Sequence, residues 1–420
     1  MTTLFTNIKS LVNARENYHL LRGNDLQQLP CIDNAYLIIE DDEIAEYGEM
    51  KNFEFLRKKG IIGQNSDFEF HFDATGRMIL PCWCDSHTHL VFAVSREDEF
   101  VQKLKGTTYA EIAARGGGIL NSARKLNETS EDELFNQAWE RLEEVSKLGT
   151  GAIEIKSGYG LTVEGELKML RVIKRLKASS KVLIKSTFLG AHAIPQEYKN
   201  NRQGYIDLII NQMLPAIAGE NLADYVDVFC EEGFFTPAET ETICRAGMQY
   251  GLKSKIHANQ LHVSGGVQAG VKLSAMSVDH LESMDDDAIN ALANSATIGT
   301  LLPTAAFFLQ LPLQPARRLI DEGCAIALAS DFNPGSSPSG NMNLVVALSC
   351  IQMRMLPEEA LNAATINGAY AMELQNEVGS ITIGKKANLI ITKPIPSIAY
   401  LPYAFGTNLI DKVMLQGQWL

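Results

Sequence analysis

The sequence predicts an α/β protein built on a (β/α)8 barrel of the TIM type, joined to a small discontinuous β domain of sandwich-like form. Two observations predict the barrel. Eight near-continuous apolar runs alternate with helical segments after residue 80, as in parallel sheets covered on both faces. Five of the eight histidines follow such runs, where a barrel places its active site. An open doubly wound sheet is the alternative, but no Gly-x-Gly-x-x-Gly turn supports it.

The two ends of the chain predict the small β domain, residues 1–80 and 375–420. Short apolar runs separated by turn residues occur in AYLIIEDDEIAEYGE, and again in VGSITIGKKANLIITK and NLIDKVMLQGQW. Such runs are typical of strands with tight turns. Because both ends flank the barrel, residues 81–374, we expect them to form one domain.

The barrel elements are expected in order along the chain. The first strand precedes His87, and the other seven lie in GAIEIKSG, KVLIKSTFLGAH, YVDVFCEEG, LKSKIHAN, MSVDHLE, ATIGTLLP and CAIALASDFNP. Ser130 with Glu133, and Thr236 with Glu239, have the spacing of a capping box, so helices are predicted to begin there.

Composition excludes several classes of protein. The net charge of −13 argues against a nucleic-acid binder and against binding to an anionic membrane surface. The seven cysteines, scattered from Cys31 to Cys350, form no disulfide framework, which favours a reducing cytoplasmic compartment. The N-terminus MTTLFTNIKSLVNARENYHL lacks the apolar core of a signal peptide, and no window predicts a membrane span.

Strand parity divides the metal-ligand residue types in PCWCDSHTH. Successive strand residues face opposite sides, so Cys82 and Cys84 share one face while His87 and His89 share the other with Asp85. The cysteines are therefore predicted to pack against the helices as small apolar residues, and Asp85 to be a support residue. The histidines offer two neighbouring imidazoles, and ligands from distant strands would leave an open position for water.

His257 and Asp331 are the predicted partners of this pair. Each ends a strand and is followed by polar residues able to hold a substrate. Three nitrogens and one carboxylate suit one transition metal per chain, divalent or trivalent, with zinc and iron as the candidates. Lys156 would bridge a second metal if it were carbamylated, but nothing in the sequence requires this. We expect Lys156 instead to be a charged residue at the barrel rim or in an ion pair.

This arrangement resembles the amidohydrolase superfamily of metal-dependent hydrolases, which also flank their barrel with a small β domain. The closer resemblance is to the imidazolonepropionase family of histidine degradation. It rests on HTHLVFAVSREDEF, IKSGYGL, FLGAHAIP, HANQ and SDFNPGS, which spread over nearly the whole barrel. Two departures are the cysteines of PCWCDSHTH, where relatives carry glycine and aliphatic residues, and Asn388, where aspartate is usual.

The resemblance implies a set of site residues. It implies that His280 is catalytic and that Tyr109 also reaches the ligand. Position 260 holds Gln260, which can orient and hydrogen-bond but cannot carry protons as glutamate would. The metal ligands are His87, His89, His257 and Asp331, and the substrate contacts are Arg96, Tyr159, His192, Gln260, Asn333, Gly335 and Ser336.

The implied reaction is hydrolysis of the cyclic amide C–N bond of 4-imidazolone-5-propanoate to N-formimidoyl-L-glutamate. A metal lowers the pKa of bound water to about 7 and makes hydroxide available as the nucleophile. Asp331 is expected to take the proton of this water and to pass it to the leaving nitrogen. His280, or the metal, would stabilise the negative charge on the ring carbonyl oxygen.

The substrate's propionate needs a cationic partner, and Arg96 suits it because a guanidinium matches a carboxylate bidentately. The alternative for Arg96 is an ion pair with Glu97, Asp98 or Glu99. Tyr159 could equally be an ordinary aromatic of the barrel rim. The stretch NPGS, residues 333–336, could be just a turn. The run Gly116-Gly117-Gly118 predicts a loop between helices and a candidate lid.

Two further functions stay open beside this one. Another cyclic amidase of the superfamily, or a nucleobase deaminase, would share the metal ligands, but Arg96 with SGYG favours an acidic substrate. A non-catalytic scaffold would lose a ligand, whereas all four candidates are present. We therefore expect a cytoplasmic enzyme, a homodimer, acting on a small anionic molecule.

Overall fold

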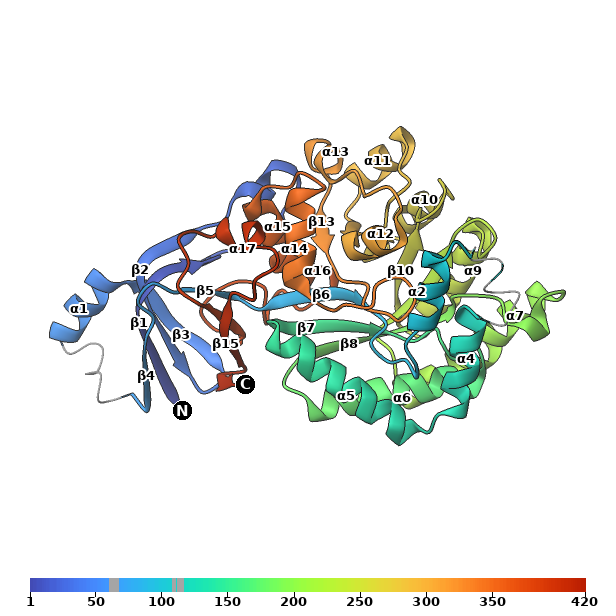
Figure 1. Ribbon diagram of the computed structural model, residues 1–420, viewed down its shortest axis with the longest axis horizontal. Helices are drawn as coiled ribbons and strands as arrows, with labels where there is room; N and C mark the ends of the chain where they lie inside the picture. Colours follow the sequence, from blue (N-terminus) through green and yellow to red (C-terminus); the bar gives the residue numbers. More distant parts are fainter. Residues whose placement is uncertain (60–67, 108–110, 112–116) are drawn as a thin grey trace.

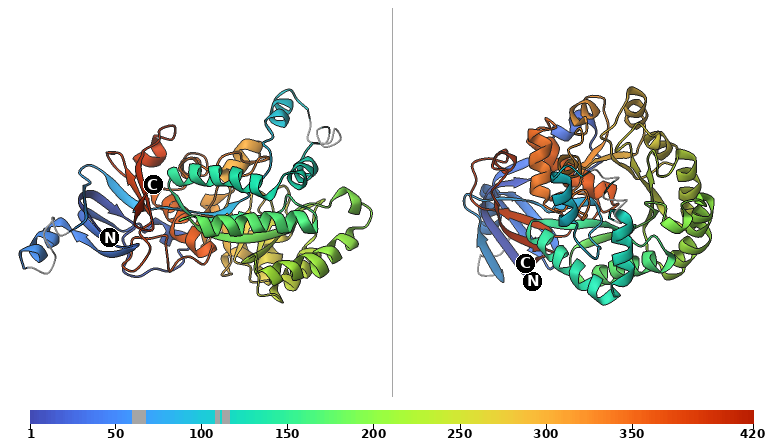
Figure 2. Two further views of the ribbon diagram at one scale, coloured as in Figure 1. Left: turned by 90° about the horizontal axis from the view of Figure 1, so that it is seen from below. Right: turned by 45° about the vertical axis from the view of Figure 1, so that its right-hand side comes forward.

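The computed structural model describes residues 1–59, 68–107, 111 and 117–420, and it has two parts (Figure 1). A barrel surrounded by helices adjoins a smaller sheet made from both ends of the chain. The two termini lie close together on the smaller part in every view (Figures 1 and 2). The predicted barrel and the predicted small β domain are both confirmed.

The barrel contains eight parallel strands that neighbour one another in chain order. Each lies where the sequence predicts it: β6 (Trp83–Thr88), β7 (Thr150–Lys156), β8 (Leu183–Ala191), β9 (Tyr225–Cys230), β10 (Lys253–Ala258), β11 (Ser277–His280), β12 (Ile298–Leu301) and β13 (Ile326–Leu328). The segment after β13 closes the barrel onto β6. The amide of Asp331 donates to the carbonyl of His87 (3.0 Å), and that of His89 donates to the carbonyl of Phe332 (2.9 Å). Closure therefore brings the His-x-His pair beside Asp331.

Helices cover the outside of the strand ring (Figure 2, right). They are α4 (Ile119–Glu128), α5 (Glu131–Lys147), α6 (Val163–Ser179), α7 (Arg202–Leu208), α8 (Leu214–Glu220), α9 (Pro237–Met248), α10 (Gly266–Lys272), α11 (Asp286–Ala293), α12 (Pro303–Leu309), α13 (Ala316–Asp321), α14 (Met342–Ile351), α15 (Pro357–Ala364) and α16 (Ile366–Ala371). Both predicted starts are found: Ser130 caps α5 by accepting from the amide of Glu133, and Thr236 with Glu239 forms a complete capping box on α9. Helix α2 (Glu97–Leu104) stands out from the barrel (Figure 2, left).

The small domain is one mixed sheet, branched at its central strand. Its strands are β1 (Thr2–Val12), β2 (Cys31–Glu40), β3 (Glu43–Glu49), β4 (Phe70–Asp73), β5 (Met78–Pro81), β14 (Leu389–Thr392), β15 (Ile410–Leu415) and β16 (Gln418–Trp419). The first half of β1 pairs in parallel with β4 and the second half with β5. Phe5, Leu37, Leu389 and Met414 lie in its core, so both ends of the chain supply it. Helices α1 (Met50–Lys58) and α17 (Tyr400–Tyr403) complete this part of the chain.

The junction between the two parts runs through residue 388. The amide of Cys82, between β5 and β6, donates to the carbonyl of Asn388 (3.0 Å). The side chain of Asn388 donates to the carbonyl of Gly151 (3.1 Å) and accepts from the amide of Gln416 (2.8 Å). An ionised aspartate could not donate to Gly151, so the departure from the family pattern at 388 suits this contact.

The N-terminal segment also reaches the barrel. The 3-10 turn η1 (Gly23–Gln27) packs on α15, and Leu21 and Leu26 belong to the large core of the barrel. Asn367 of α16 accepts from the amide of Leu21 (3.1 Å) and donates to its carbonyl (2.9 Å). The domain limits of 1–80 and 375–420 therefore remain a proposal. Among the described residues, no helix is both long and apolar enough to cross a membrane.

Candidate metal centre and active site

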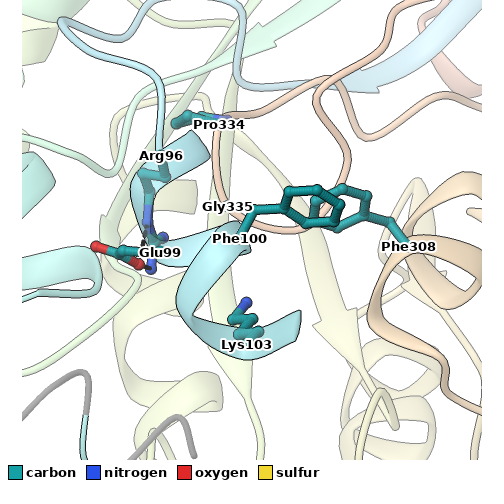
Figure 3. A pocket seen from close by; sticks show the side chains of 7 residues that line it. All are labelled: Arg96, Glu99, Phe100, Lys103, Phe308, Pro334 and Gly335. Atoms are coloured by element: carbon teal, nitrogen blue, oxygen red, sulfur yellow. Dashed lines mark hydrogen bonds and ion pairs between the residues drawn. The ribbon is translucent and has the colours of Figure 1, made fainter. Parts of the chain in front are cut away.

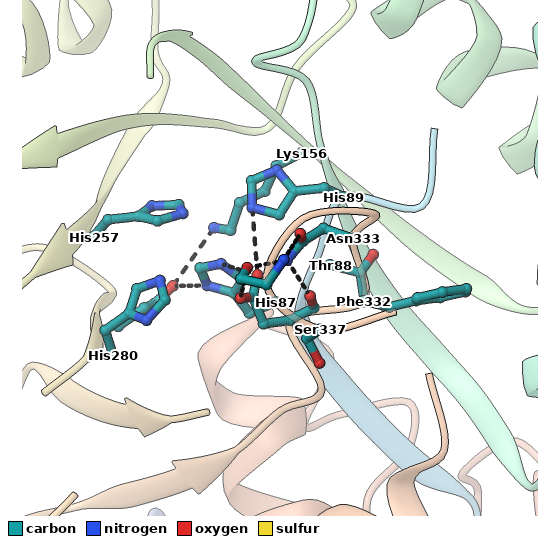
Figure 4. A network of polar contacts seen from close by, with 12 residues as sticks. His87, Thr88, His89, Lys156, His257, His280, Phe332, Asn333 and Ser337 are labelled. Carbon is teal, nitrogen blue, oxygen red and sulfur yellow. Dashed lines mark hydrogen bonds and ion pairs between the residues drawn. The ribbon is translucent and has the colours of Figure 1, made fainter. Parts of the chain in front are cut away.

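Four histidines and one aspartate meet inside the barrel, at the carboxyl ends of its strands (Figure 4). They are His87, His89, His257, His280 and Asp331, and all five are buried. The ring of His87 lies 4.5 Å from that of His257 and 5.4 Å from that of His89. His280 lies 5.2 Å from His257. The four ligands predicted from the sequence and the predicted catalytic histidine are thus brought together.

The donor atoms fit a metal ion. Nε2 of His87 and Nε2 of His89 lie 3.5 Å and 3.6 Å from Oδ1 of Asp331. Two atoms each bound about 2.1 Å from one tetrahedral metal lie about 3.4 Å apart. Nε2 of His87 is buried and has no hydrogen-bond partner among the described residues. A second group with the spacing of metal ligands, His87 with His257 and His280, overlaps the first.

The protonation states also suit a metal. Burial lowers the pKa of His87 and of His89 well below the usual histidine value, and the neighbouring Lys156 and His192 add to this effect. Neutral imidazole is the form that coordinates a metal. Burial raises the pKa of Asp331, although nearby histidines and the Ser336 hydroxyl partly oppose this. His87 and His89 therefore offer neutral nitrogens beside the carboxyl group of Asp331.

A cluster of buried charges lies among the strands close to these histidines. It consists of Glu154, Lys156, Asp227, Lys255 and Asp279, which we call the interior network. Glu154 accepts hydrogen bonds from Lys156 (2.6 Å) and Lys255. Lys156 also donates to Asp227 (2.9 Å) and lies 3.5 Å from Asp279. Each buried charge thus has partners of the opposite sign, which such burial requires.

The interior network orients two of the candidate ligands. Oδ2 of Asp279 lies 2.6 Å from Nδ1 of His87, and Oδ2 of Asp227 lies 2.9 Å from Nδ1 of His257. A carboxylate at the far nitrogen of a ligand histidine fixes its tautomer and ring orientation. Lys156 touches both carboxylates, so one cation holds the supports of two histidines.

The expectation that Lys156 lies at the barrel rim is wrong, whereas the expected ion pair is present. The side chain is fully buried among the strands. Burial lowers the pKa of Lys156, but Asp227, Glu154 and Asp279 outweigh this and raise it above the ordinary value. A charged ammonium is not the form that is carbamylated, so the structure supports the ion pair instead of a metal bridge.

Sequence reasoning missed most of the interior network. The signal was present as charged residues within apolar strands, in GAIEIK, YVDVF, LKSKIH and SVDH. Alternate residues of a barrel strand point inward, so Glu154 and Lys156 share the inner side of β7. A charge at such a position needs a partner on a neighbouring strand, and the partner could have been sought there.

Cys84 lies on the other side of β6 from His87 and His89, as strand parity predicts, although the register of β6 with β7 shifts at two points. Cys84 packs with Ala369 and Met372 on the helix side of β6, away from the histidines, and all seven cysteines are free. Asp85 accepts from the amide (2.9 Å) and the hydroxyl (2.6 Å) of Ser330, directly after β13. Burial raises the pKa of Asp85 to about 7. Asp85 is therefore a support residue, which ties β6 to the last strand.

Tyr159 and His192 lie beside the centre. The ring of His192 is stacked on that of His89 at 5.4 Å, and Tyr159 lies 5.6 Å from His192 and 5.8 Å from His89. Nδ1 of His192 lies 3.0 Å from the carbonyl of Gly158. Burial lowers the pKa of His192 to about 3. Both residues are thus placed to meet a molecule bound at the centre.

The loop after β13 is organised by Asn333. Its side-chain oxygen accepts from the amides of Gly335 and Ser336, each at 2.8 Å, and its nitrogen donates to the carbonyl of Asp331 (2.6 Å). Ser336 in turn donates to Oδ2 of Asp331 (3.1 Å). The turn expected from the sequence is present, and the amide of Asn333 is engaged within it.

Arg96 forms the ion pair that was the alternative to a substrate contact. Its Nε and Nη2 donate to Oε2 of Glu99, at 2.9 Å and 2.6 Å. A small pocket beside this pair is lined by Pro334 and Gly335 and by the stacked rings of Phe100 and Phe308 (Figure 3). A Cβ on Gly335 would lie 2.4 Å from Nη1 of Arg96, so any other residue there would displace the guanidinium.

Gln260 is half-buried at the end of β10. Glu231, buried at the end of β9, accepts from the amides of Leu261 (2.9 Å) and Glu232 (2.8 Å) and so fixes the chain just after Gln260. Tyr109 and Gly116 lie outside the described residues.

Relatives at high identity cover the whole chain. Residues 231–420 match the model of the amidohydrolase family. The chain is 58% identical to an imidazolonepropionase of Flavobacterium johnsoniae and 55% identical to one of Christiangramia forsetii, and each alignment covers 100% of both chains.

Solved structures share the fold at low identity. A triazine hydrolase variant matches with a TM-score of 0.74 at 14% identity, over 100% of this chain and 94% of that one. An adenosine deaminase from Xanthomonas campestris with bound zinc matches with a TM-score of 0.70 at 13% identity, over 99% and 92% of the two chains. These two likenesses concern the fold alone.

Proposed function

The chain belongs to the imidazolonepropionase family of amidohydrolases, and we propose that the buried centre around His87 and Asp331 carries out its hydrolysis. The reaction is the opening of the cyclic amide C–N bond of 4-imidazolone-5-propanoate, which yields N-formimidoyl-L-glutamate in histidine degradation. The observation that carries the proposal is the meeting of four histidines and Asp331 in one buried cluster beside His192 and Tyr159.

We propose that His87, His89, His257 and Asp331 hold one metal ion, zinc or iron. The unpartnered Nε2 of His87 and its distance from Asp331 support this choice. His280 also has the spacing of a metal ligand with His87 and His257, but we assign it to the substrate instead of to the metal. A metal bound there would polarise a water molecule and lower its pKa, so that a nucleophile is present at neutral pH.

Asp331 acts as the proton shuttle in this proposal. It takes a proton from the attacking water and delivers it to the ring nitrogen that leaves when the C–N bond breaks. Burial raises the pKa of Asp331, which makes its carboxylate a stronger base than an exposed one. The hydrogen bond from Ser336 to Oδ2 holds the carboxylate in one orientation while the proton moves.

His280 stabilises the negative charge that develops on the ring carbonyl oxygen. Burial lowers its pKa, but the carboxyl groups of Glu282, Asp331 and Asp279 outweigh this and raise it above the ordinary value. The cationic form is therefore favoured, and a cation is the better donor to a developing oxyanion.

The substrate is held by groups around the centre. We propose that Tyr159, His192 and Gln260 contact the ring and that Arg96 binds the propionate. Glu99 already engages Nε and Nη2 of Arg96, so the propionate would meet Nη1, on the side of Gly335. Asn333, whose amide is engaged in its own loop, would contribute by shaping that loop for Gly335 and Ser336.

The test is the ring opening of imidazolone propionate by the purified protein, followed by the loss of its ultraviolet absorption. Turnover that requires zinc or iron, and that is lost on treatment with a chelator, is the expected result. A neutral imidazolone without the propionate should be a poor substrate. Turnover of a nucleobase, with none of imidazolone propionate, would instead favour the deaminase alternative. Full activity in metal-free protein would exclude the proposed mechanism.

We further propose that the enzyme works in the cytoplasm as a homodimer. The seven free cysteines, most of them buried, suit a reducing compartment. Sedimentation at several protein concentrations tests the dimer.

A further inference from the structure

The loop between β7 and α6 carries Tyr159 in an unusual backbone conformation. It comprises residues 157–161, Ser-Gly-Tyr-Gly-Leu. Gly158 has φ +107° and Leu161 has φ +54°, both in the left-handed region. A leucine in that region costs free energy that the surrounding contacts must offset. Something other than local preference therefore holds this loop.

The carboxylate of Glu166 supplies those contacts. Glu166 lies in the first turn of α6, is fully buried, and accepts hydrogen bonds from three backbone amides of the loop. Oε2 accepts from Gly158 (3.0 Å), while Oε1 accepts from Gly160 and from Leu161 (2.8 Å each). One side chain thus satisfies the backbone donors on both sides of Tyr159.

The fit around this carboxylate leaves no space for other side chains. A Cβ on Gly160 would lie 2.3 Å from the backbone nitrogen of Glu166. A Cβ on Gly158 would lie 2.9 Å from Nδ1 of His192 and 3.0 Å from the carbonyl oxygen of Leu189. The loop is therefore pressed against α6 on one side and against the end of β8 on the other.

The same loop reaches His192. The carbonyl of Gly158 lies 3.0 Å from Nδ1 of His192, and a carbonyl can only accept, so Nδ1 carries the hydrogen. The other nitrogen of the neutral ring is then an acceptor. Because Glu166 holds the amide of Gly158, it also sets where this carbonyl points. Tyr159 and His192 thus depend on one carboxylate, which binds the backbone amides of the loop.

We propose that Glu166 is a positioning residue for substrate recognition, which fixes Tyr159 and makes Nε2 of His192 an acceptor for a ring N–H of the substrate. This inference rests on the proposed function of the same site. It assigns the histidine to the N–H of the imidazolone and not to its carbonyl oxygen, because a nitrogen without hydrogen cannot donate to an oxygen.

The first experiment compares Glu166→Gln with Glu164→Gln. Both remove one carboxylate from the first turn of α6, but Glu164 is exposed. The amide of the glutamine at 166 would turn an NH₂ group toward backbone donors, which disrupts the loop. We expect KM for imidazolone propionate to rise about tenfold or more in Glu166→Gln with a smaller change in kcat. Glu164→Gln should keep the wild-type KM, and both variants should keep their metal content.

A spectroscopic measurement reports on His192 directly. In wild type, the ¹⁵N NMR signals of His192 should show a protonated Nδ1 and an unprotonated Nε2, and Glu166→Gln should shift them toward a mixture of tautomers. In a His192→Ala background, Glu166→Gln should raise KM much less than it does alone, because the two residues act as a unit. Should Glu166→Gln fail to fold, Glu166→Asp withdraws the carboxylate by one methylene and serves the same comparisons.

The outcomes separate this inference from the proposed function. An unchanged KM and unchanged His192 signals in Glu166→Gln, with wild type active on imidazolone propionate, would overturn the role of Glu166 and leave the function intact. Loss of the metal in a folded Glu166→Gln protein would also overturn it, because the effect would then pass through the centre. Wild-type protein without activity on imidazolone propionate contradicts the proposed function, while the NMR comparison still decides whether Glu166 sets the tautomer.

Discussion

The interior network and the rim of the barrel use the same residue types in different ways. Inside, carboxylates accept from ammonium groups on neighbouring strands, as Glu154 does from Lys156 and Lys255. At the rim, buried acceptors take backbone amides of loops. We call four of these side chains the rim acceptors. Glu99 accepts from the amide of residue 118, and Glu166 from those of 158, 160 and 161. Glu231 accepts from the amides of 232 and 261, and Asn333 from those of 335 and 336.

This difference separates two tasks. The interior network orients histidines on rigid strands, whereas the rim acceptors give shape to loops that have no regular structure of their own. Damage to the first is expected to weaken metal binding, and damage to the second to weaken substrate binding. Each of the following changes tests that division.

The largest effect is expected at Asp331, where the two tasks meet. Asp331→Asn removes the proposed ligand and proton shuttle, so kcat/KM should fall roughly 10³-fold. Bound metal, measured by elemental analysis, should fall as well. Asp321→Asn, at an exposed aspartate on α13, is the control and should keep full activity. A loss of less than tenfold at Asp331 would contradict its role as shuttle.

Lys156→Met tests the interior network. It leaves Asp227 and Asp279 buried without their shared cation, so the free energy of unfolding should fall by about 3–5 kcal/mol. The affinity for zinc, measured by competition with a chelator, should fall about 10–100-fold. Lys185→Met on β8, whose side chain is 20% exposed, is the matched control. Unchanged zinc affinity in folded Lys156→Met would show that the network does not support the ligands.

Arg96→Met tests the rim. Loss of the cation should raise KM for imidazolone propionate about 10–100-fold and change kcat less, since a clamp remote from the reacting bond supplies mainly binding. Metal content should stay at the wild-type level. Arg124→Met, at an exposed arginine of α4, controls for loss of charge. A drop in kcat with unchanged KM would assign Arg96 to the chemistry instead.

The pH dependence of stability tests His192, which lies between the two regions. Its pKa is lowered to about 3 in the folded state, against 6.5 for the ordinary group. Between these values the unfolded chain binds one more proton, so the free energy of unfolding falls as the pH falls below 6.5. The loss is at most about 1.4 kcal/mol per pH unit. His192→Gln should lessen this slope in denaturant titrations at pH 7.5 and 5.5.

Cys84→Ala should have the smallest effect. Cys84 packs against α16, so its loss should cost about 1 kcal/mol of unfolding free energy by leaving a small cavity. Zinc affinity and kcat should match those of wild type. A loss of bound metal would contradict the division of PCWCDSHTH by strand parity.

The eight strands and the five groups of the centre could be predicted because their signals are local. An apolar run marks each strand, and a polar residue after it marks the end that faces the site. His87 and His89 were separated from Cys82 and Cys84 by the two-residue period of a strand alone. The register of β6 with β7 shifts between Trp83 and Cys84 and again between Asp85 and Thr88, but the side chain of Cys84 still packs against α16.

The roles of Lys156, Glu166 and Arg96 could not be predicted in the same way. Each is defined by a partner distant in sequence or by a loop conformation. Lys156 meets Asp227 and Asp279 across the barrel. A charged residue within an apolar run does not show in the sequence which residue will be its ion-pair partner. Arg96 had the substrate carboxylate or one of three acidic neighbours as its candidate partner. The structure pairs it with Glu99 and places its Nη1 against Gly335.

The sequence by itself determined the barrel, the joining of its two ends in one sheet, and the strand ends at which the candidate ligands lie. Periodicity and strand-end polarity are properties of neighbouring residues. Only the tertiary structure decided which charges balance one another inside the barrel and which acceptors hold the loops at its mouth. The physical reason is that a buried charge or backbone amide needs a partner, and the groups available to it are those that lie near it once the barrel has closed. For Lys156 and Glu166 those partners exist only after the strands and helices have assembled.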